Sequence, residues 1–280
     1  MKGTHPSEWR VGTSYDPYDP NAELKLNEIK EAGFDYIELV LSSSHQDLNL
    51  EGLREKFNPS MEFARNLGLN IWSVHLPFGD SWDISILDLE KRNEILEYHY
   101  EWIKWVSEWN VNKVIIHPSF EPILDQQRLD RIQACRQSLA KLNEKAKQFG
   151  FEICVECLPR TCLGNSSTEI KNIIKNNEEL GVCCDVNHLL NEKPEDFIIE
   201  LGSKISTLHM SDYDGIDEKH WMPGRGIINW MKVLRALSNT GYKGPFMFEV
   251  SNANAKQMIS CWRDLLQAYE KKSNLLSFTK

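Results

Sequence analysis

Six residues that can bind metals or transfer protons stand at the ends of short apolar segments of the chain. They are His75, His117, Glu156, Asp185, His209 and Glu249. The apolar segments have the length of buried β-strands, and side chains alternate faces along a strand, so His209 projects opposite to Leu208. Two more histidines, His188 and His220, follow in polar loops. Any one of these residues is weak evidence, but together they indicate a reactive site.

Three carboxylates crowded into one cavity raise each other's pKa unless a cation compensates. A buried salt-bridge network would need about as many basic residues near the strand ends, where only Arg160 and Arg225 are evident. Mixed imidazole and carboxylate ligands suit Mn, Zn, Co or Fe, and an oxygen-rich set leaves Mg open as well. We therefore expect one divalent metal, with a second or third ion left open.

Short apolar segments alternate with longer segments of helical periodicity along the whole chain. Strands are predicted at 9–14, 34–41, 69–76, 113–117, 151–157, 181–185, 205–209 and 245–250, and helices at 22–32, 53–67, 91–110, 127–149, 167–176, 194–201, 229–238 and 255–275. This alternation calls for a parallel sheet, and eight strands favour a closed (β/α)8 TIM barrel. No shift in composition marks a linker, so residues 1–280 are expected to form a single domain. The active site of such a barrel lies at the C-terminal ends of the strands.

Composition and charge narrow the class of partner. The net charge of −9 argues against a protein that binds by neutralising phosphates, so nucleic acid is not the expected partner. No stretch reaches the ~18 apolar residues of a membrane span, and the start, MKGTHPSEWR, lacks the apolar run of a signal peptide. Seven cysteines, an odd number, make a poor disulfide framework, which favours a reduced, cytoplasmic setting.

Five other residues need a separate account. Glu38 lies between apolar neighbours in the segment 34–41, where it is either a pocket residue or paired to a cation in the core. Arg225 either holds an anionic group of the substrate through bidentate bonds or forms a surface salt bridge. His5, His45 and His99 stand apart from the cluster, with His99 expected on a helix surface.

Several segments together resemble one family of barrels: WSVHLP, VIIHPS, CVECLPR, CCDVNHLL, TLHMSDYDG, HWMPGRGIINW and FMFEV. The chain resembles the sugar phosphate isomerase/epimerase family of xylose isomerase-like TIM barrels, which includes ketose 3-epimerases and inosose isomerases or dehydratases and is related to endonuclease IV. The resemblance implies one divalent metal held by Glu156, Asp185, His209 and Glu249. It also implies that His188 and His220 contact oxygen atoms of the substrate.

The same resemblance implies proton transfer on a small sugar or polyol. One glutamate, Glu156 or Glu249, would remove the proton beside a carbonyl, and the other would return it after a metal-stabilised enediolate has formed. Two positions depart from the ketose 3-epimerase pattern: Cys162 stands where those enzymes carry a second glutamate, and His220 where they carry an arginine. These changes put 3-epimerisation itself in doubt. A homodimer is left open.

Endonuclease IV-like hydrolysis is the main alternative. In those relatives the positions of His75 and His117 help to hold a second metal, and those of His188 and His220, with Glu218 or Asp217, hold a third. The chain lacks the Lys/Arg-rich loops that duplex DNA requires, which favours sugar chemistry. An inosose-type dehydratase would use the same metal and bases, whereas a non-catalytic sugar-binding barrel would have little use for two opposed glutamates.

Overall fold

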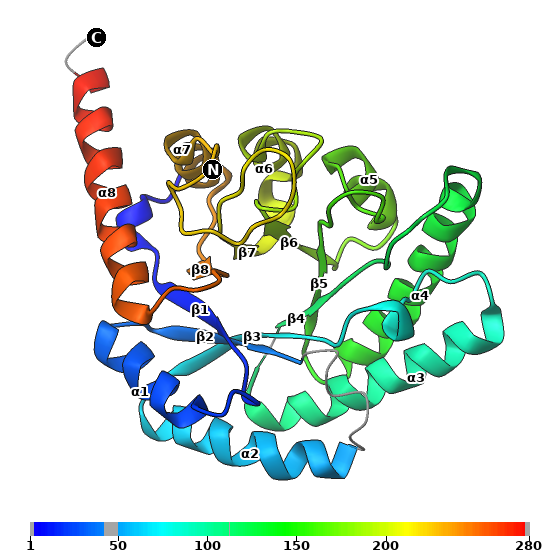
Figure 1. The fold of residues 1–280 in the computed structure, drawn as a ribbon. Coiled ribbons are helices and arrows are strands. Elements are labelled where there is room, and N and C mark those ends of the chain that lie inside the picture. The colour runs from blue at the N-terminus through cyan, green and yellow to red at the C-terminus, as the bar shows by residue number, and fades with distance from the viewer. Residues whose placement is uncertain (1–2, 42–49, 112, 278–280) are drawn as a thin grey trace.

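Eight parallel strands surround a common axis, with helices packed outside them (Figure 1). The computed structural model describes residues 3–41, 50–111 and 113–277. The strands are β1 (Val11–Tyr15), β2 (Tyr36–Val40), β3 (Asn70–His75), β4 (Lys113–Ile116), β5 (Glu152–Glu156), β6 (Gly181–Asp185), β7 (Ile205–His209) and β8 (Phe246–Phe248). All eight predicted strands are present, and β6 and β7 have the predicted bounds.

The eight main helices follow the strands in turn. They are α1 (Ala22–Ala32), α2 (Leu50–Asn66), α3 (Leu89–Val106), α4 (Arg128–Lys147), α5 (Ser167–Ile173), α6 (Pro194–Leu201), α7 (Trp230–Thr240) and α8 (Ala255–Ser277). Local chemistry sets their ends. The Asp88 carboxylate accepts hydrogen bonds from the first-turn N–H groups of α3. Gly33 ends α1 with φ 101°, a left-handed conformation that glycine adopts without a steric penalty.

The sheet closes into a barrel. Strands β1 to β7 are hydrogen-bonded in sequence order, and β8 pairs with β1. Between β7 and β8 the ladder is reduced to one bridge, in which Met210 N donates to Met247 O at 2.9 Å and Glu249 N donates to Met210 O at 3.4 Å. The prediction of a (β/α)8 TIM barrel is confirmed.

A small apolar cluster lies inside the barrel, separate from the main core between sheet and helices. It consists of Ile115, Cys154 and Cys183, all fully buried. Each stands two residues before a candidate site residue, namely His117, Glu156 and Asp185. Since side chains alternate with a period of two along a strand, these three share the inward face of the candidate residues and form a floor beneath them.

Three further expectations bear on the core and the setting. All seven cysteines are free, in agreement with the expectation of no disulfide framework. No helix in the described ranges is both long and apolar enough to cross a membrane. The expectation that His99 lies on a helix surface is wrong: it is fully buried on α3, 3.2 Å from Trp82 O, and its burial lowers its pKa to about 4. His45 lies outside the described residues.

Candidate metal centre

Glu156 lies at the centre of the residues that the strand ends bring together. It is 1% exposed at the end of β5. Its Oε2 atom is 2.9 Å from His75 Nε2 and 3.0 Å from His117 Nε2, and its Oε1 atom is 2.8 Å from His209 Nδ1. Three strand ends that are distant in the sequence therefore converge on one carboxylate.

The predicted ligand set is assembled around this carboxylate. Glu156, Asp185, His209 and Glu249 each offer one donor atom, and the four atoms lie within 4.8 Å of one another. His209 Nδ1 is 3.4 Å from Glu249 Oε2 and 3.9 Å from Asp185 Oδ2. Ligand atoms on opposite sides of a zinc-sized ion are about 4.2 Å apart, because each lies about 2.1 Å from it. The cluster is therefore close to the size that a divalent cation needs.

Asp185 gives an independent test of fit. Its Oδ2 atom is buried and has no hydrogen-bond partner among the described residues, although His188 Nδ1 lies 3.2 Å away. Such an atom is costly unless something binds it. A cation held by the four donors would satisfy Asp185, so the residues present fit a divalent metal.

Three further donor groups adjoin or overlap the first. One is Glu156 with His75 and His117, one is Glu156 with His209 and the thiol of Cys183, and the last is His188, Glu218 and His220. Glu218 rather than Asp217 joins His188 and His220, because its Oε2 atom is 3.1 Å from His188 Nε2. The described residues therefore offer donor atoms for more than one ion.

Glu38, on β2, holds His209 from the side opposite Glu156. Its Oε1 atom is 2.7 Å from His209 Nε2, and its Oε2 atom accepts a 2.5 Å hydrogen bond from Ser73 Oγ. All three residues are fully buried. A carboxylate in this position fixes the ring orientation and the proton on Nε2, which leaves Nδ1 to bind a metal. Glu38 is thus paired with a buried imidazole whose pKa is raised well above its ordinary value, in agreement with the interpretation that it pairs with a cation in the core.

The electrostatics are those of a buried site crowded with acids and imidazoles. Burial, reinforced by the charges of Glu249 and Glu156, raises the pKa of Asp185 to about 7. Burial opposes the charged form of His188, yet the neighbouring Asp185 and Glu218 raise its pKa to about 10. Protons on His75, His188 and His209, whose pKa values are raised, thus balance the carboxylates, and a metal would displace such protons on binding.

The segment between β7 and α7, which carries Glu218 and His220, is shaped by one buried acid. Asp212 accepts hydrogen bonds from Gly224 N at 2.8 Å, Ile228 N at 3.2 Å and Trp230 Nε1 at 2.9 Å. Ion pairs also restrain the segment: Arg160 contacts Glu121, Asp217 and Glu218 at 2.7–2.9 Å. The strongest of the effects that lower the pKa of Glu218 to about 2 is its bond with His188, followed by Arg160.

The structure does not bring Arg225 into the cluster. This residue is exposed and lines a separate hollow with Gln257, Ser260, Cys261 and Asp264 of α8. Among the described ion pairs, none includes Arg225. Its assignment to substrate binding stays a prediction, as do the assignments of His188 and His220.

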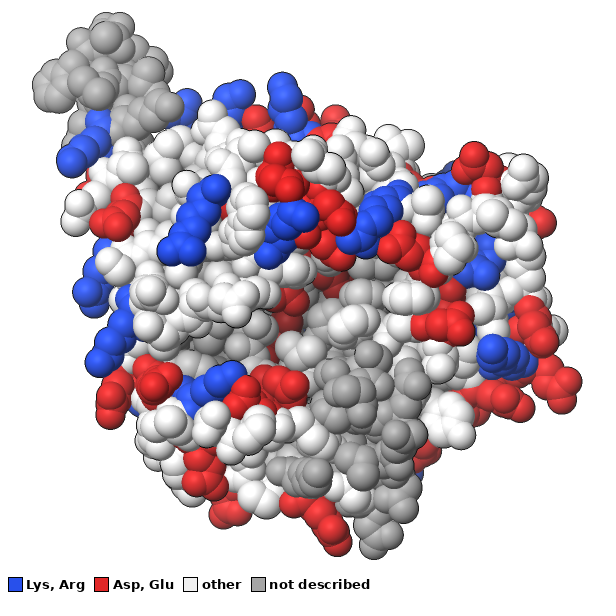
Figure 2. All heavy atoms as spheres, in the orientation of Figure 1, with Lys and Arg blue, Asp and Glu red and all other residues white. Residues whose placement is uncertain are grey.

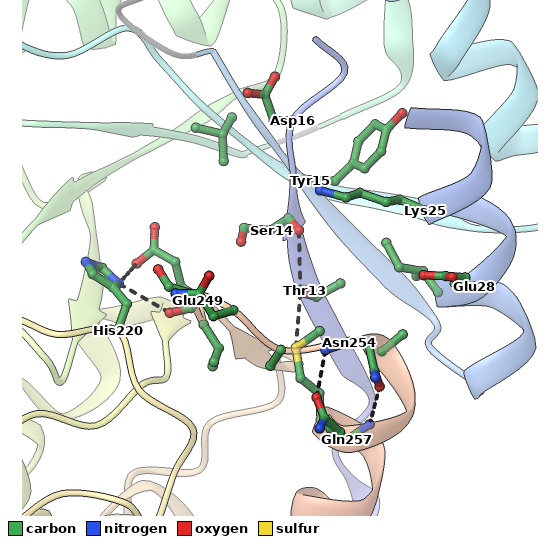
Figure 3. Close-up of a pocket in the computed structure, with 18 residues that line it drawn as sticks. Thr13, Ser14, Tyr15, Asp16, Lys25, Glu28, His220, Glu249, Asn254 and Gln257 are labelled. Atoms are coloured by element: carbon green, nitrogen blue, oxygen red, sulfur yellow. Dashed lines mark hydrogen bonds and ion pairs between the residues drawn. The ribbon is translucent and has the colours of Figure 1, made fainter. Parts of the chain in front are cut away.

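A cavity of about 800 Å³ opens beside the donor groups. Figure 3 shows Glu249 and His220 on one side of it, with Ser14 and Tyr15 of β1 across from them. The space-filling view shows acidic side chains inside the central hollow of this face, with basic and acidic side chains mixed around it (Figure 2). A ligand in the cavity would therefore reach the metal ligands from the side of Glu249.

Comparison with known proteins identifies the family. Residues 26–271 match the family described as "Xylose isomerase-like TIM barrel", and the chain belongs to it, which confirms the resemblance. An uncharacterized protein, MJ1311 of Methanocaldococcus jannaschii, is 27% identical over 255 residues, covering 87% of this chain and 83% of that protein. The D-psicose 3-epimerase of Ruminiclostridium cellulolyticum is 22% identical over 271 residues, covering 91% and 88%.

Solved structures agree on the fold. A D-tagatose 3-epimerase-like protein superposes with a TM-score of 0.80 at 24% identity, covering 94% of this chain and 99% of that one. The IOLI protein with a bound zinc atom superposes with a TM-score of 0.73 at 17% identity, covering 92% and 98%. At these identities the likeness establishes the shared barrel and leaves the chemistry to the residues of the site.

Proposed function

We propose that the protein is a divalent-metal-dependent isomerase or epimerase of a sugar or polyol. The observation that carries the proposal is the convergence of Glu156, Asp185, His209 and Glu249 within 4.8 Å, with two carboxylates available as bases. The names of the relatives point the same way, because a D-psicose 3-epimerase and a D-tagatose 3-epimerase-like protein share the fold over most of the chain.

The four ligands would hold Mn, Zn, Co or Mg, and the zinc of the IOLI protein is a precedent within the fold. When bound, such an ion supplies Lewis acidity that polarises a substrate carbonyl. Glu38 orients His209, and the buried floor of the barrel excludes water from beneath the ligands. Glu156 and Glu249 are the two bases: one takes the proton from the carbon beside the carbonyl, and the other delivers a proton to complete the reaction.

Exchange of substrate hydrogen with solvent tests this chemistry directly. The protein loaded with Mn, Co or Zn is incubated in D₂O with a panel of ketoses, and deuterium incorporation and product identity are followed by NMR. We expect incorporation that falls at least a hundredfold in Glu156→Gln and Glu249→Gln. Glu144→Gln, the same change on the exposed surface of α4, is the matched control. Full exchange in both site variants would rule out the two-base assignment, and loss of water from the substrate would indicate a dehydratase.

Phosphodiester hydrolysis is a second candidate because further donor groups adjoin the four proposed ligands and could hold further ions. A site with several ions stabilises both the attacking and the leaving oxygen atoms of a phosphodiester. Elemental analysis separates the candidates: one metal per chain supports isomerisation, and three support hydrolysis. Cleavage of a duplex with one abasic site, assayed beside deuterium exchange, gives a second readout. The acidic hollow in Figure 2 favours the first candidate.

A further inference from the structure

The cavity beside Glu249 extends well beyond the metal ligands. Its volume of about 800 Å³ is large among ligand-binding cavities, which span roughly 300–1,000 Å³. Figure 3 shows His220 and Glu249 on one side and Lys25 and Glu28 of α1 on the other, with Asn254 at the start of α8. A single sugar ring whose carbonyl lies at the ligands would occupy only the side of Glu249. The far side has room for a second unit of the substrate.

The charge of the far side does not suit an anion. Asp16 and Glu28 line it together with one cation, Lys25, whose ammonium group is already paired with Asp19. No arginine is among the described residues that line the cavity. Phosphates are typically bound by arginine or by free N–H groups at a helix start. At the start of α8, two of the N–H groups are already bonded: Gln257 N donates to Asn254 Oδ1 at 2.9 Å and Met258 N to Asn254 O at 3.2 Å.

The amide groups at the start of α8 suit a neutral, hydroxylated ligand. Asn254 N donates to Gln257 Oε1 at 3.0 Å, so both side-chain oxygens serve the helix cap. The two NH₂ groups remain as hydrogen-bond donors on the cavity wall, and the carboxylates of Asp16 and Glu28 are acceptors. A hydroxyl group both donates and accepts, so a polyol matches this mixture, whereas a phosphate only accepts.

We propose that the far side of the cavity binds a second, neutral sugar or polyol unit, so that the substrate is a glycoside or similar two-unit compound. This inference rests on the proposed function and names its substrate class. Asn254 and Gln257 then determine specificity by contacting the unit that does not react.

Three ketoses that differ only at the 6-position serve as probes: fructose, fructose 6-phosphate and isomaltulose, which carries a glucosyl group there. Affinities are measured calorimetrically on the Mn-loaded protein and by saturation-transfer NMR on the metal-free protein. We expect isomaltulose to bind at least tenfold more tightly than fructose, and fructose 6-phosphate no more tightly than fructose. Asn254→Asp and Gln257→Glu keep the cap oxygen but remove the NH₂ donors, so each should reduce the preference for isomaltulose over fructose at least threefold. Lys256→Ala, on the exposed side of α8, is the control.

The outcomes separate this inference from the proposed function. Preference for fructose 6-phosphate, equal affinity for all three probes, or no binding of isomaltulose would overturn the second-unit site. A preference for isomaltulose that is lost in the α8 variants, with no deuterium exchange in any ketose, would support the site and contradict the isomerase assignment.

Discussion

Replacement of Glu38 by glutamine isolates the effect of one buried charge on the metal centre. Glutamine has nearly the same volume and can still accept the hydrogen bond from His209 Nε2, which is 2.7 Å from Glu38 Oε1. A bond to a charged group contributes about 1.5–3 kcal/mol and a neutral one about 0.5–1.5 kcal/mol. The difference, about 1–1.5 kcal/mol, corresponds to roughly a tenfold loss of metal affinity, within the range of about 10–100-fold typical for such supporting residues.

Metal affinity is measured by competition titration of the metal-free protein with Mn or Zn, and the proton position on His209 by ¹⁵N NMR. In Glu38→Gln we expect about tenfold weaker binding and a mixture of His209 tautomers, because the glutamine NH₂ group can donate a hydrogen bond to Nε2, which a carboxylate cannot do. Glu152→Gln is the matched control: Glu152 is also on a barrel strand, but it pairs with Lys113 and Ser206, away from the donor groups. Unchanged affinity in Glu38→Gln, or an equal loss in both variants, would refute the reasoning.

Three further outcomes follow from the geometry. Since burial lowers the pKa of His99 to about 4 from its ordinary 6.5, the neutral buried ring contributes stability above pH 6.5 that is lost as the pH falls to 4. Between these pH values, chemical denaturation should show that the free energy of unfolding of His99→Gln falls by up to about 3 kcal/mol less than that of wild type. Parallel curves of unfolding free energy against pH would contradict this prediction. Because the pKa of Asp185 is about 7, metal affinity should rise with pH through neutrality, with proton release seen by calorimetry in buffers of different ionisation enthalpy; a pH-independent affinity would exclude this coupling. Arg160→Met should leave the carboxylates of Glu121, Asp217 and Glu218 to repel one another. Amide hydrogen exchange in residues 214–220 should then become at least tenfold faster. Unchanged protection would show that the arginine does not restrain the segment.

The barrel and much of its centre could be predicted from the sequence because strand ends are local features. A short apolar run followed by His, Asp or Glu identifies both the strand and its inward residue, so the donors from β3 to β8 were all predicted. Barrel closure then brings them together without further information. Loops do not follow such a rule: the choice of Glu218 over Asp217 depends on how Asp212 and Arg160 fold the segment after β7.

Glu38 shows what local patterns cannot supply. Its position between apolar neighbours marked it as unusual, but its partners stand on strands β3 and β7, and contact between them depends on the packed interior. The helical pattern around His99 predicts an exposed side chain, because a histidine in an amphipathic helix is usually exposed. Its burial arises from tertiary packing against Trp82, which helical periodicity does not report.

The join between β7 and β8 gives the candidate metal centre a second role, in stability. The sheet there is held by a single bridge at Met210; β7 ends at His209 and Glu249 directly follows β8, one on each side of the join. An ion bound by both side chains would cross-link the two strands where the barrel has the fewest hydrogen bonds. Loss of the ion would then weaken the join between β7 and β8. The same event would abolish the activity and make the C-terminal part of the chain easier to unfold.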